Sequence, residues 1–460
     1  MSTPELGAIV AGAGIAGLAA ALEFQQSSPE ILVVDASDRP GGVMRTDHVA
    51  GFVIERGPNT TQVKAPMLEF LRHLGADDQL LAAQSAGRRR YFYRDGKLVR
   101  VPDSPGAFVR SPLLTARGKL RLLAEPFVGR RDATGESVSE FIGRRLGDEV
   151  ASGLVGPFLT GVYAGDEREL GAEAVFPALV DHEHRSGSLA MGMLGGAVAS
   201  AFGRSRSKGL PGSYSAPNGM GPFARLLAER LVEPPALDSR VTGLHRDGDA
   251  WLVFISGPGG AQRLRARHIV IAVPAPQAAE ILRGVDTELA RALEQIEYAP
   301  IVGVPLGVTP SAVREKIDGF GFLVPHQREI SLLGCLYMSR LFAGRAPAGR
   351  ELFQCILGGT HWREVIGQPD DVILNKLHAD LDQVLGLDDE PETLAITRVR
   401  QAIPQPGRNH PRLVAEIRAS LGRLPGIELA GAYLDGISVS DALTSGLNAA
   451  RSLQGLPIHP

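Results

Sequence analysis

A glycine-rich turn near the start of the chain constrains the fold more than any other feature. Residues 12–17 read GAGIAG and stand between a short apolar run, residues 8–11, and an alanine-rich stretch that favours a helix. A second apolar run, residues 31–34, follows and ends in Asp35. A strand, a G-x-G-x-x-G turn, a helix, a second strand and an acid within about 30 residues form the pattern of a dinucleotide-binding βαβ unit.

The three glycines of this turn have separate physical tasks. Gly12 makes the tight turn, Gly14 lets the backbone approach a pyrophosphate, and Gly17 lets helix and strand pack closely. The pyrophosphate then faces the free N–H groups of the helix N-terminus. Asp35, 23 residues after Gly12, is placed to accept hydrogen bonds from a ribose. An ordinary tight turn of an α/β fold is the alternative interpretation.

The next stretch favours FAD over NAD. Residues 35–46 read DASDRPGGVMRT, in which Gly41 and Gly42 allow a second close backbone approach and Arg39 can bring positive charge to the pyrophosphate. This double glycine resembles the motif of the flavin amine oxidase superfamily, whereas the alternative is a Pro-Gly turn with solvated arginines. Residues 57–59, GPN, form another turn that is placed to bring main chain against a flavin ring.

The far end of the chain predicts a second contact with the same cofactor. Residues 427–430 are typical of a strand and run into residues 431–446, where Ser438 or Ser440 can serve as the N-cap of a helix. That helix N-terminus, aimed at the flavin pyrimidine edge, would stabilise the anionic reduced ring. The alternative is an ordinary capped terminal helix.

Because the two motifs lie at opposite ends of the chain, we expect a discontinuous FAD domain, to which a predicted hairpin over residues 241–255 also belongs.

Composition limits the partners. A formal net charge of −3 disfavours a general nucleic-acid binder. Two cysteines cannot form a disulfide framework, which favours a cytoplasmic location, and we expect neither a signal peptide nor a spanning helix. No second G-x-G-x-x-G motif marks an NADPH module, so we expect the electrons to pass to oxygen or another diffusible acceptor.

One segment departs strongly from this average charge. Residues 87–131 hold twelve Arg or Lys and three Asp or Glu, a net charge of +9. Such asymmetry favours an anionic partner, either a carboxylate-bearing substrate or a membrane surface, and the alternative is a solvated face. Residues 113–127 predict an amphipathic helix with basic and apolar faces.

Residues 181–184, DHEH, lack the i,i+4 spacing of a helical zinc site, so we expect a polar surface stretch there and no metal.

Motifs along almost the whole chain narrow the family. GVYAGDEREL (residues 161–170) and VFPALVDHEHRSGSLAMGML (residues 175–194) resemble the most diagnostic stretch of the protoporphyrinogen/coproporphyrinogen oxidase family. RRYFYRDGKLVRVP, GFGFLVP and the terminal GAYLDGISVSDALTSG are similar to that family too, and in the same order. The resemblance implies porphyrinogen oxidation in haem biosynthesis, with FAD as cofactor and oxygen as acceptor.

The resemblance also implies an α/β fold of three parts. The first is a discontinuous, Rossmann-like FAD-binding domain of p-hydroxybenzoate-hydroxylase type, expected over residues 1–85, 212–285 and 410–460. The second is a mostly helical, membrane-associating domain over residues 86–211. The third is a substrate-binding domain over residues 286–409. Peripheral contact with a membrane follows from this resemblance, and a homodimer stays open.

The family's site residues carry over to matching positions of this sequence. Arg90 matches an arginine that faces a substrate propionate, and Gly161 matches a glycine whose carbonyl faces the pyrrole N–H groups. Leu323, Leu333 and Ile356 match apolar positions that sandwich the macrocycle beside the flavin. The residues expected to contact FAD are Gly12, Ala13, Gly14, Ile15, Ala16, Gly17, Asp35, Arg39, Gly41, Gly42, Val43, Gly57, Pro58, Asn59, Val241, Ala432, Ile437, Ser438 and Val439.

Some positions depart from the family pattern and leave the substrate open. Ala432 and Ala442 stand where many members carry Asn and Cys, and residues 205–215 match poorly. Protoporphyrinogen IX oxidation is the main hypothesis, and coproporphyrinogen III is the nearest alternative. A flavin amine oxidase and a flavoprotein without turnover are more distant ones. No catalytic base is predicted, because aromatisation supplies the driving force.

Overall fold

The computed structural model describes residues 5–28, 30–190, 209–325 and 329–459. Its first sheet has six strands, taken from both ends and the middle of the chain. β1 pairs in parallel with β2 and β12, and β12 pairs in parallel with β19, while β10 and β11 extend β12 as antiparallel neighbours. These strands are β1 (Glu5–Ala11), β2 (Ile31–Val34), β10 (Arg240–Asp247), β11 (Ala250–Gly257), β12 (Gly260–Ile271) and β19 (Ile427–Leu429).

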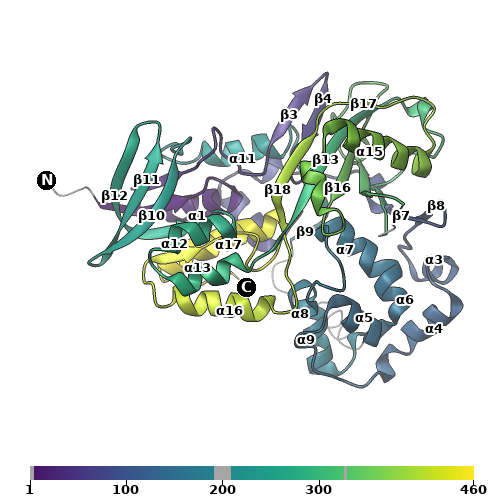
Figure 1. The fold of residues 1–460 in the computed structure, drawn as a ribbon, viewed down its shortest axis with the longest axis horizontal. Coiled ribbons are helices and arrows are strands. Elements are labelled where there is room, and N and C mark those ends of the chain that lie inside the picture. Colours follow the sequence, from purple (N-terminus) through teal and green to yellow (C-terminus); the bar gives the residue numbers. More distant parts are fainter. Residues whose placement is uncertain (1–4, 29, 191–208, 326–328, 460) are drawn as a thin grey trace.

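Both faces of this sheet are covered by helices (Figure 1). Within β1, Ala8 and Val10 belong to one apolar core while Ile9 and Ala11 belong to the other, as expected for a parallel strand buried on both sides. The first core is closed by α1 (Ile15–Gln25), α2 (Ala65–His73), α11 (Met220–Ala228) and α17 (Val439–Leu453). The second is closed by α12 (Ala275–Leu282), α13 (Thr287–Glu294) and α16 (His410–Leu421).

The second sheet has eight strands in the order β17-β13-β16-β15-β14-β7-β8, with β18 also paired to β13. Its edge hairpin β7–β8 comes from the segment expected to be helical, and β7 joins the sheet through a parallel pairing with β14. The strands are β7 (Tyr91–Arg94), β8 (Lys97–Arg100), β13 (Tyr298–Val308), β14 (Gly321–Leu323), β15 (Leu332–Tyr337), β16 (Glu351–Gly358), β17 (Glu392–Thr393) and β18 (Thr397–Pro404).

One face of the second sheet packs on a long helix, α15 (Asp370–Leu385). Ile373, Leu377 and Leu381 of this helix share an apolar core with Phe322 and Val304 of the sheet. Two smaller sheets are present within the described residues. One pairs β3 (Thr46–Val49) with β4 (Phe52–Glu55), and the other has three strands, with β9 (Leu210–Ser215) between β5 (Thr61–Val63) and β6 (Leu81–Ala82).

A helical region lies below the second sheet in Figure 1. Its helices are α3 (Pro105–Arg110), α4 (Ala116–Leu123), α5 (Val138–Leu146), α6 (Asp148–Val150), α7 (Gly156–Tyr163), α8 (Ala172–Val175) and α9 (Pro177–Ser186). The predicted amphipathic helix is shorter than expected, because α4 ends at Leu123 and a 3₁₀ turn, Glu125–Phe127, follows. No helix of the described residues is long and apolar enough to cross a membrane.

A buried ion-pair network holds this region together and corrects one prediction. Residues 181–184 were expected to be a polar surface stretch, but Glu183 is fully buried. Its carboxylate pairs with Arg144 (2.7 Å) and Arg145 (3.4 Å). Burial raises the pKa of Glu183, but hydrogen bonds from Arg144 and the Arg131 N–H outweigh it and hold this pKa below its usual range. The sequence pattern missed this because the partners come from another helix.

Candidate functional site

The first glycine turn has the geometry that its sequence predicts. Gly12 has a φ of +108°, which favours glycine. A Cβ on Gly17 would lie 1.8 Å from the carbonyl oxygen of Gly12, so only glycine lets α1 begin this close to β1. A Cβ on Gly14, in contrast, would meet no atom within 4 Å. Two glycines therefore build the turn, and the third faces open space.

The N-terminus of α1 faces the same space. Gly14 is its N-cap, and no side chain of the described residues caps the first turn. Asp35 follows β2, and its carboxylate accepts hydrogen bonds from the N–H groups of Ala13 (2.6 Å) and Ser37 (2.8 Å). An uncapped helix N-terminus beside open space is a ready site for a phosphate group.

The double glycine packs directly on this turn. The Gly41 N–H donates to the Ala13 carbonyl (2.8 Å), and a Cβ on Gly42 would lie 3.3 Å from the Gly14 Cα. The guanidinium of Arg39 donates to the carbonyls of Gly42 (3.0 Å) and Met44 (3.1 Å). Burial lowers the pKa of Arg39. Arg39 thus holds the shape of the double-glycine turn through its carbonyl contacts.

Residues 57–59 lie beside the end of that turn. A Cβ on Gly57 would lie 1.9 Å from the carbonyl oxygen of Val43, so the two segments touch backbone to backbone. The Val43 side chain is 56% exposed, which is unusual for valine. The Oδ1 atom of Asn59 is buried and has no hydrogen-bond partner among the described residues. Both features suit a group that would cover this surface.

The N-terminus of α17 is capped as predicted, with Ser438 as the N-cap residue. Ser438 Oγ accepts from the Asp441 N–H (3.1 Å), and the Asp441 carboxylate accepts from the Ser438 N–H (3.3 Å). The Lys64 ammonium pairs with Asp441 at 2.5 Å, a contact between segments too far apart in the chain for a local pattern to predict. Burial, together with the Asp441 charge, raises the pKa of Tyr163 to about 12, so the phenol stays protonated at neutral pH.

Of the remaining residues expected near the cofactor, three lie in α17 or in the segment just before it, and one lies in the second apolar core. Ala432 packs partly buried against the first core, and Ile437 stands just before the N-cap of α17. Val439 is the first residue of α17 and is buried. Val241 is 5% exposed in β10 and belongs to the second core.

The apolar residues expected around a substrate come together on one face of the second sheet. Leu323 of β14 is paired with Gly334 of β15, which is paired with Ile356 of β16, so their side-chain positions share a face. The register shifts between Leu332 and Gly334, and the intervening Leu333 lies in one apolar cluster with Ile356.

Helix α7 brings Gly161 onto the same residues. A Cβ on Gly161 would lie 2.4 Å from a methyl group of Leu323, so a larger residue at this position would displace the Leu323 side chain. Leu323 therefore joins the predicted helix position to the predicted sheet positions.

Arg90 is a cation without an ion-pair partner among the described residues. Its guanidinium lies over the ring of Phe320, 4.9 Å from the ring centre, and burial lowers its pKa. The neighbouring Arg89 differs, because its guanidinium pairs with Asp318 at 2.5 Å. Phe320 directly precedes β14, so the unpaired charge lies near the strand that carries Leu323. This arrangement suits an anionic group on a ligand held at the sheet.

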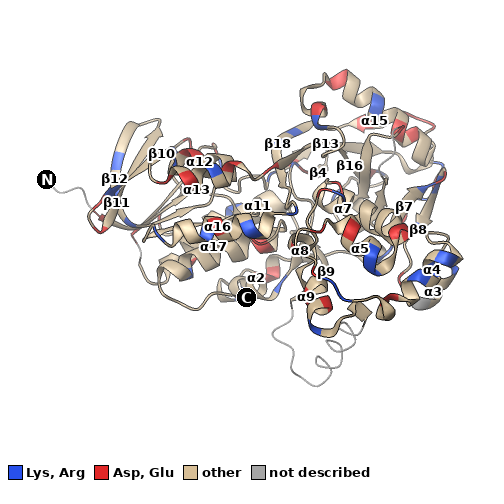
Figure 2. Cartoon of the chain, turned by 60° about the horizontal axis from the view of Figure 1, so that its bottom comes forward, with Lys and Arg blue, Asp and Glu red and all other residues tan. Residues whose placement is uncertain are grey.

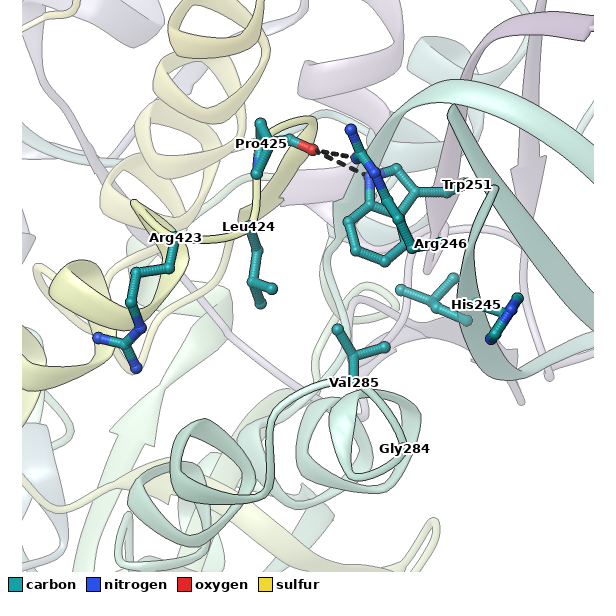
Figure 3. A pocket seen from close by; sticks show the side chains of 9 residues that line it. His245, Arg246, Trp251, Gly284, Val285, Arg423, Leu424 and Pro425 are labelled. Carbon is teal, nitrogen blue, oxygen red and sulfur yellow. Dashed lines mark hydrogen bonds between the residues drawn. The ribbon is translucent and has the colours of Figure 1, made fainter. Parts of the chain in front are cut away.

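Two surface cavities lie away from these residues. One, of about 330 Å³, is walled by the β10–β11 hairpin and the loop before β19 (Figure 3). There Trp251 Nε1 and the Arg246 guanidinium both donate to the Pro425 carbonyl, at 3.0 and 2.9 Å. The other, of about 500 Å³, has a mixed acidic and basic lining that includes Glu297, Arg363 and other polar residues. Neither is lined by a residue that the sequence predicts for cofactor or substrate.

The family model for flavin containing amine oxidoreductases matches residues 15–454 of this chain. The chain belongs to this family. It is 29% identical over 469 residues to protoporphyrinogen oxidase 2, chloroplastic/mitochondrial, of Arabidopsis thaliana, covering 96% of this chain and 92% of that protein. It is 26% identical over 473 residues to the coproporphyrinogen III oxidase of Bacillus subtilis (strain 168), covering 97% of each.

A solved structure confirms the fold over the whole chain. A protein from Exiguobacterium sp. 255-15, provisionally assigned as a protoporphyrinogen oxidase, superposes with a TM-score of 0.80 at 22% identity, covering 98% of this chain and 99% of that one. The mixed α/β fold is that of an FAD-dependent amine oxidase. The chain is thus an FAD-dependent oxidoreductase, and the predictions of superfamily, enzyme class and cofactor are confirmed.

The residues of the site fit FAD as the family's cofactor. Within the described residues, the open space at Gly14, the uncapped α1 N-terminus and the unpartnered Asn59 Oδ1 each leave a polar or van der Waals contact for a ligand to complete. Two further polar residues lie near the site without a sequence motif that marks them: Lys64, and Gln354, which is 4% exposed in β16. A polar residue inside the apolar run LFQCILG was the available signal for Gln354.

Replacing Gly14 separates cofactor binding from folding. Gly14→Ala should leave the unfolding temperature of the FAD-free protein within about 2 °C, since the added methyl group meets no protein atom. It should weaken FAD binding about 10-fold or more, because the methyl group would occupy the space that a pyrophosphate needs. Titration of the apoprotein with FAD, followed by flavin fluorescence, measures this. The matched control is Gly367→Ala, where a Cβ also meets no atom within 4 Å. Unchanged FAD affinity in Gly14→Ala would contradict the assignment.

Proposed function

We propose that this enzyme oxidises protoporphyrinogen IX to protoporphyrin IX in haem biosynthesis. The observation that carries the proposal is the match over nearly the whole chain to protoporphyrinogen oxidases. The site adds support, because an apolar sheet face beside an unpaired arginine suits an apolar macrocycle with propionate side chains. The Bacillus subtilis relative makes coproporphyrinogen III the second candidate. That substrate carries four propionates, against two on protoporphyrinogen IX.

We propose the following roles within the chain. Residues 1–85, 212–285 and 410–460 bind FAD in a domain of p-hydroxybenzoate-hydroxylase type. Residues 286–409, with the hairpin β7–β8, hold the substrate. The helical region is formed by the rest of residues 86–211, of which residues 191–208 lie outside the described part of the chain. The FAD contacts are Gly12, Ala13, Gly14, Ile15, Ala16, Gly17, Asp35, Arg39, Gly41, Gly42, Val43, Gly57, Pro58, Asn59, Val241, Ala432, Ile437, Ser438 and Val439.

The protein's own residues bind and orient the macrocycle. Leu323, Leu333 and Ile356 pack against its apolar faces, Arg90 pairs with a propionate, and the Gly161 carbonyl accepts from a pyrrole N–H. FAD held by the residues named above would supply a two-electron acceptor, so removal of six hydrogens would need three such oxidations, balanced by three molecules of oxygen reduced to hydrogen peroxide. Aromatisation of the product supplies driving force, so the site needs to position the substrate and exclude water.

The proposal is tested by porphyrin fluorescence. The FAD-loaded protein should convert protoporphyrinogen IX in air faster than coproporphyrinogen III, after correction for autoxidation of each. Three molecules of hydrogen peroxide should form per porphyrin. Preference for coproporphyrinogen III would move the enzyme to the second candidate, and no catalysed conversion of either would overturn the function.

Arg90 should control substrate binding. Arg90→Ala should raise KM for the porphyrinogen about 10-fold or more, since a charge-assisted hydrogen bond is lost, while FAD content stays unchanged. Steady-state kinetics and the flavin-to-protein absorbance ratio measure the two effects. The matched control is Arg263→Ala, which removes another guanidinium that lies over an aromatic ring, that of Phe254. An unchanged KM in Arg90→Ala would remove Arg90 from the site.

We also propose that the helical region rests on a membrane surface, with the enzyme peripheral on the cytoplasmic side. Large apolar side chains here are unusually exposed: Val109 and Leu120 at 68%, Leu123 at 73% and Phe127 at 90%. Lys and Arg gather on α4, which carries Arg117, Lys119 and Arg121 (Figure 2), and α3 ends in Arg110. Exposed apolar residues beside basic ones suit the headgroup region of an anionic bilayer.

Removing two of these apolar groups should weaken membrane binding. Leu123→Ser with Phe127→Ser should reduce binding to vesicles of anionic phospholipid about 10-fold or more, because each side chain loses burial in the bilayer. Sedimentation with vesicles measures this. Val232→Ser is the matched control, since Val232 is 62% exposed outside this region. Equal binding by the double variant and the wild type would contradict the proposal.

A further inference from the structure

The sheet face that carries Leu323 and Ile356 is unusually free of side chains. Gly334 stands between these two residues on β15, and Gly303 of β13 is paired with Ile356 on the other side. Paired residues of antiparallel strands place their side chains on the same face. The row therefore alternates leucine, glycine, isoleucine and glycine, and leaves a low surface between two apolar side chains. The opposite face of the same strands is filled by the core under α15.

One polar side chain lies on this low surface. Gln354 stands two residues before Ile356 on β16, so the two side chains point to the same face. A Cβ on Gly303 would lie 3.1 Å from Gln354 Nε2, so the amide lies over the glycine. Gln354 is 4% exposed, and its Oε1 has no hydrogen-bond partner among the described residues.

Neighbouring residues place Gln354 near the segment that is expected to contact the flavin. Gly303 is also paired with Thr397 of β18. The Oγ1 atom of Thr397 accepts a hydrogen bond from Arg56 (2.8 Å), and Arg56 directly precedes residues 57–59. The amide thus lies close to the segment proposed to touch the isoalloxazine ring.

A buried amide oxygen without a partner is costly, because folding removes water from it and returns nothing. A strand of apolar neighbours could hold a leucine at this position without that cost. A ligand that brings an N–H group to Oε1 would restore the missing hydrogen bond, and a porphyrinogen carries four such donors.

We propose that Gln354 accepts a hydrogen bond from a pyrrole N–H of the bound porphyrinogen and favours it over the porphyrin product. The inference rests on the proposed function. The four carbons that bridge the pyrroles of a porphyrinogen are tetrahedral, so the ring puckers and its N–H groups can tilt toward one face. In the planar porphyrin the two remaining N–H groups point inward, within the ring plane. An acceptor on the sheet face therefore reaches the substrate and not the product.

The test is Gln354→Leu in the FAD-loaded enzyme. KM for protoporphyrinogen IX should rise about 5-fold, as expected for one hydrogen bond. The inhibition constant of protoporphyrin IX should stay within about 2-fold, and the unfolding temperature should stay equal or rise. Gln354→Met is the second variant if the leucine shape packs poorly. Gln454→Leu is the matched control, because Gln454 also has a buried Oε1 without a partner among the described residues, at the far end of α17.

The outcomes separate the two proposals. If the wild type converts a porphyrinogen and Gln354→Leu keeps the wild-type KM, the inference alone is overturned. Equal losses of substrate and product affinity would overturn the discrimination, and weaker FAD binding would make the flavin the partner of Gln354. If the wild type converts neither porphyrinogen, the proposed function fails and the inference falls with it.

Discussion

Direct contact between backbones, with no space for a Cβ atom, determines how the two ends of this chain meet. A Cβ on Gly17 would lie 1.8 Å from the Gly12 carbonyl oxygen, and one on Gly446 would lie 1.9 Å from the Ala16 carbonyl oxygen. The first contact fixes α1 on its own strand, and the second fixes the C-terminal helix α17 on α1. Because both contacts are made near the glycine-rich turn, the N-termini of these helices are held in a fixed relation. A cofactor that lies along both could not be bound by either end of the chain alone.

The two faces of the second sheet differ: one is packed as a core, and the other is left partly bare by glycines. On one face, an ordinary apolar core packs against α15 and includes Phe322, Cys335 and Cys355. On the other face, Gly303 and Gly334 remove side chains where Leu323 and Ile356 provide them. This alternation follows from the two-residue period of a strand, so the same strands build a stable core with one set of residues and leave a shaped surface with the other.

Local patterns in the sequence predicted the parts of the fold that depend on neighbours in the chain. The βαβ turn, the hairpin over residues 241–255 and the Ser438 N-cap each require only a few adjacent residues, and the structure confirms them. Contacts between distant segments were not predictable in this way. The burial of Glu183 requires Arg145 from α5, and the place of the β7–β8 hairpin requires pairing with β14. The position of Leu333 depends on a register shift that no local pattern reveals.

Two buried polar side chains of this protein, Arg145 and Gln354, differ in how far their hydrogen bonds are satisfied, and the difference indicates different roles. Arg145 is fully buried, but its guanidinium reaches four acceptors: Glu125, Glu183, and the carbonyls of Val128 and Gly187. These contacts offset most of the cost of burying the charge, although Arg145 Nε has no hydrogen-bond partner among the described residues, and so the network serves the fold. Gln354 is almost as buried, but no group of the described residues donates a hydrogen bond to its Oε1. Since a leucine would fill the same space without a desolvation cost, stability alone does not account for an amide there. A group that completes its hydrogen bonds only when a ligand arrives does account for it, because the cost in the free enzyme is then recovered as binding energy.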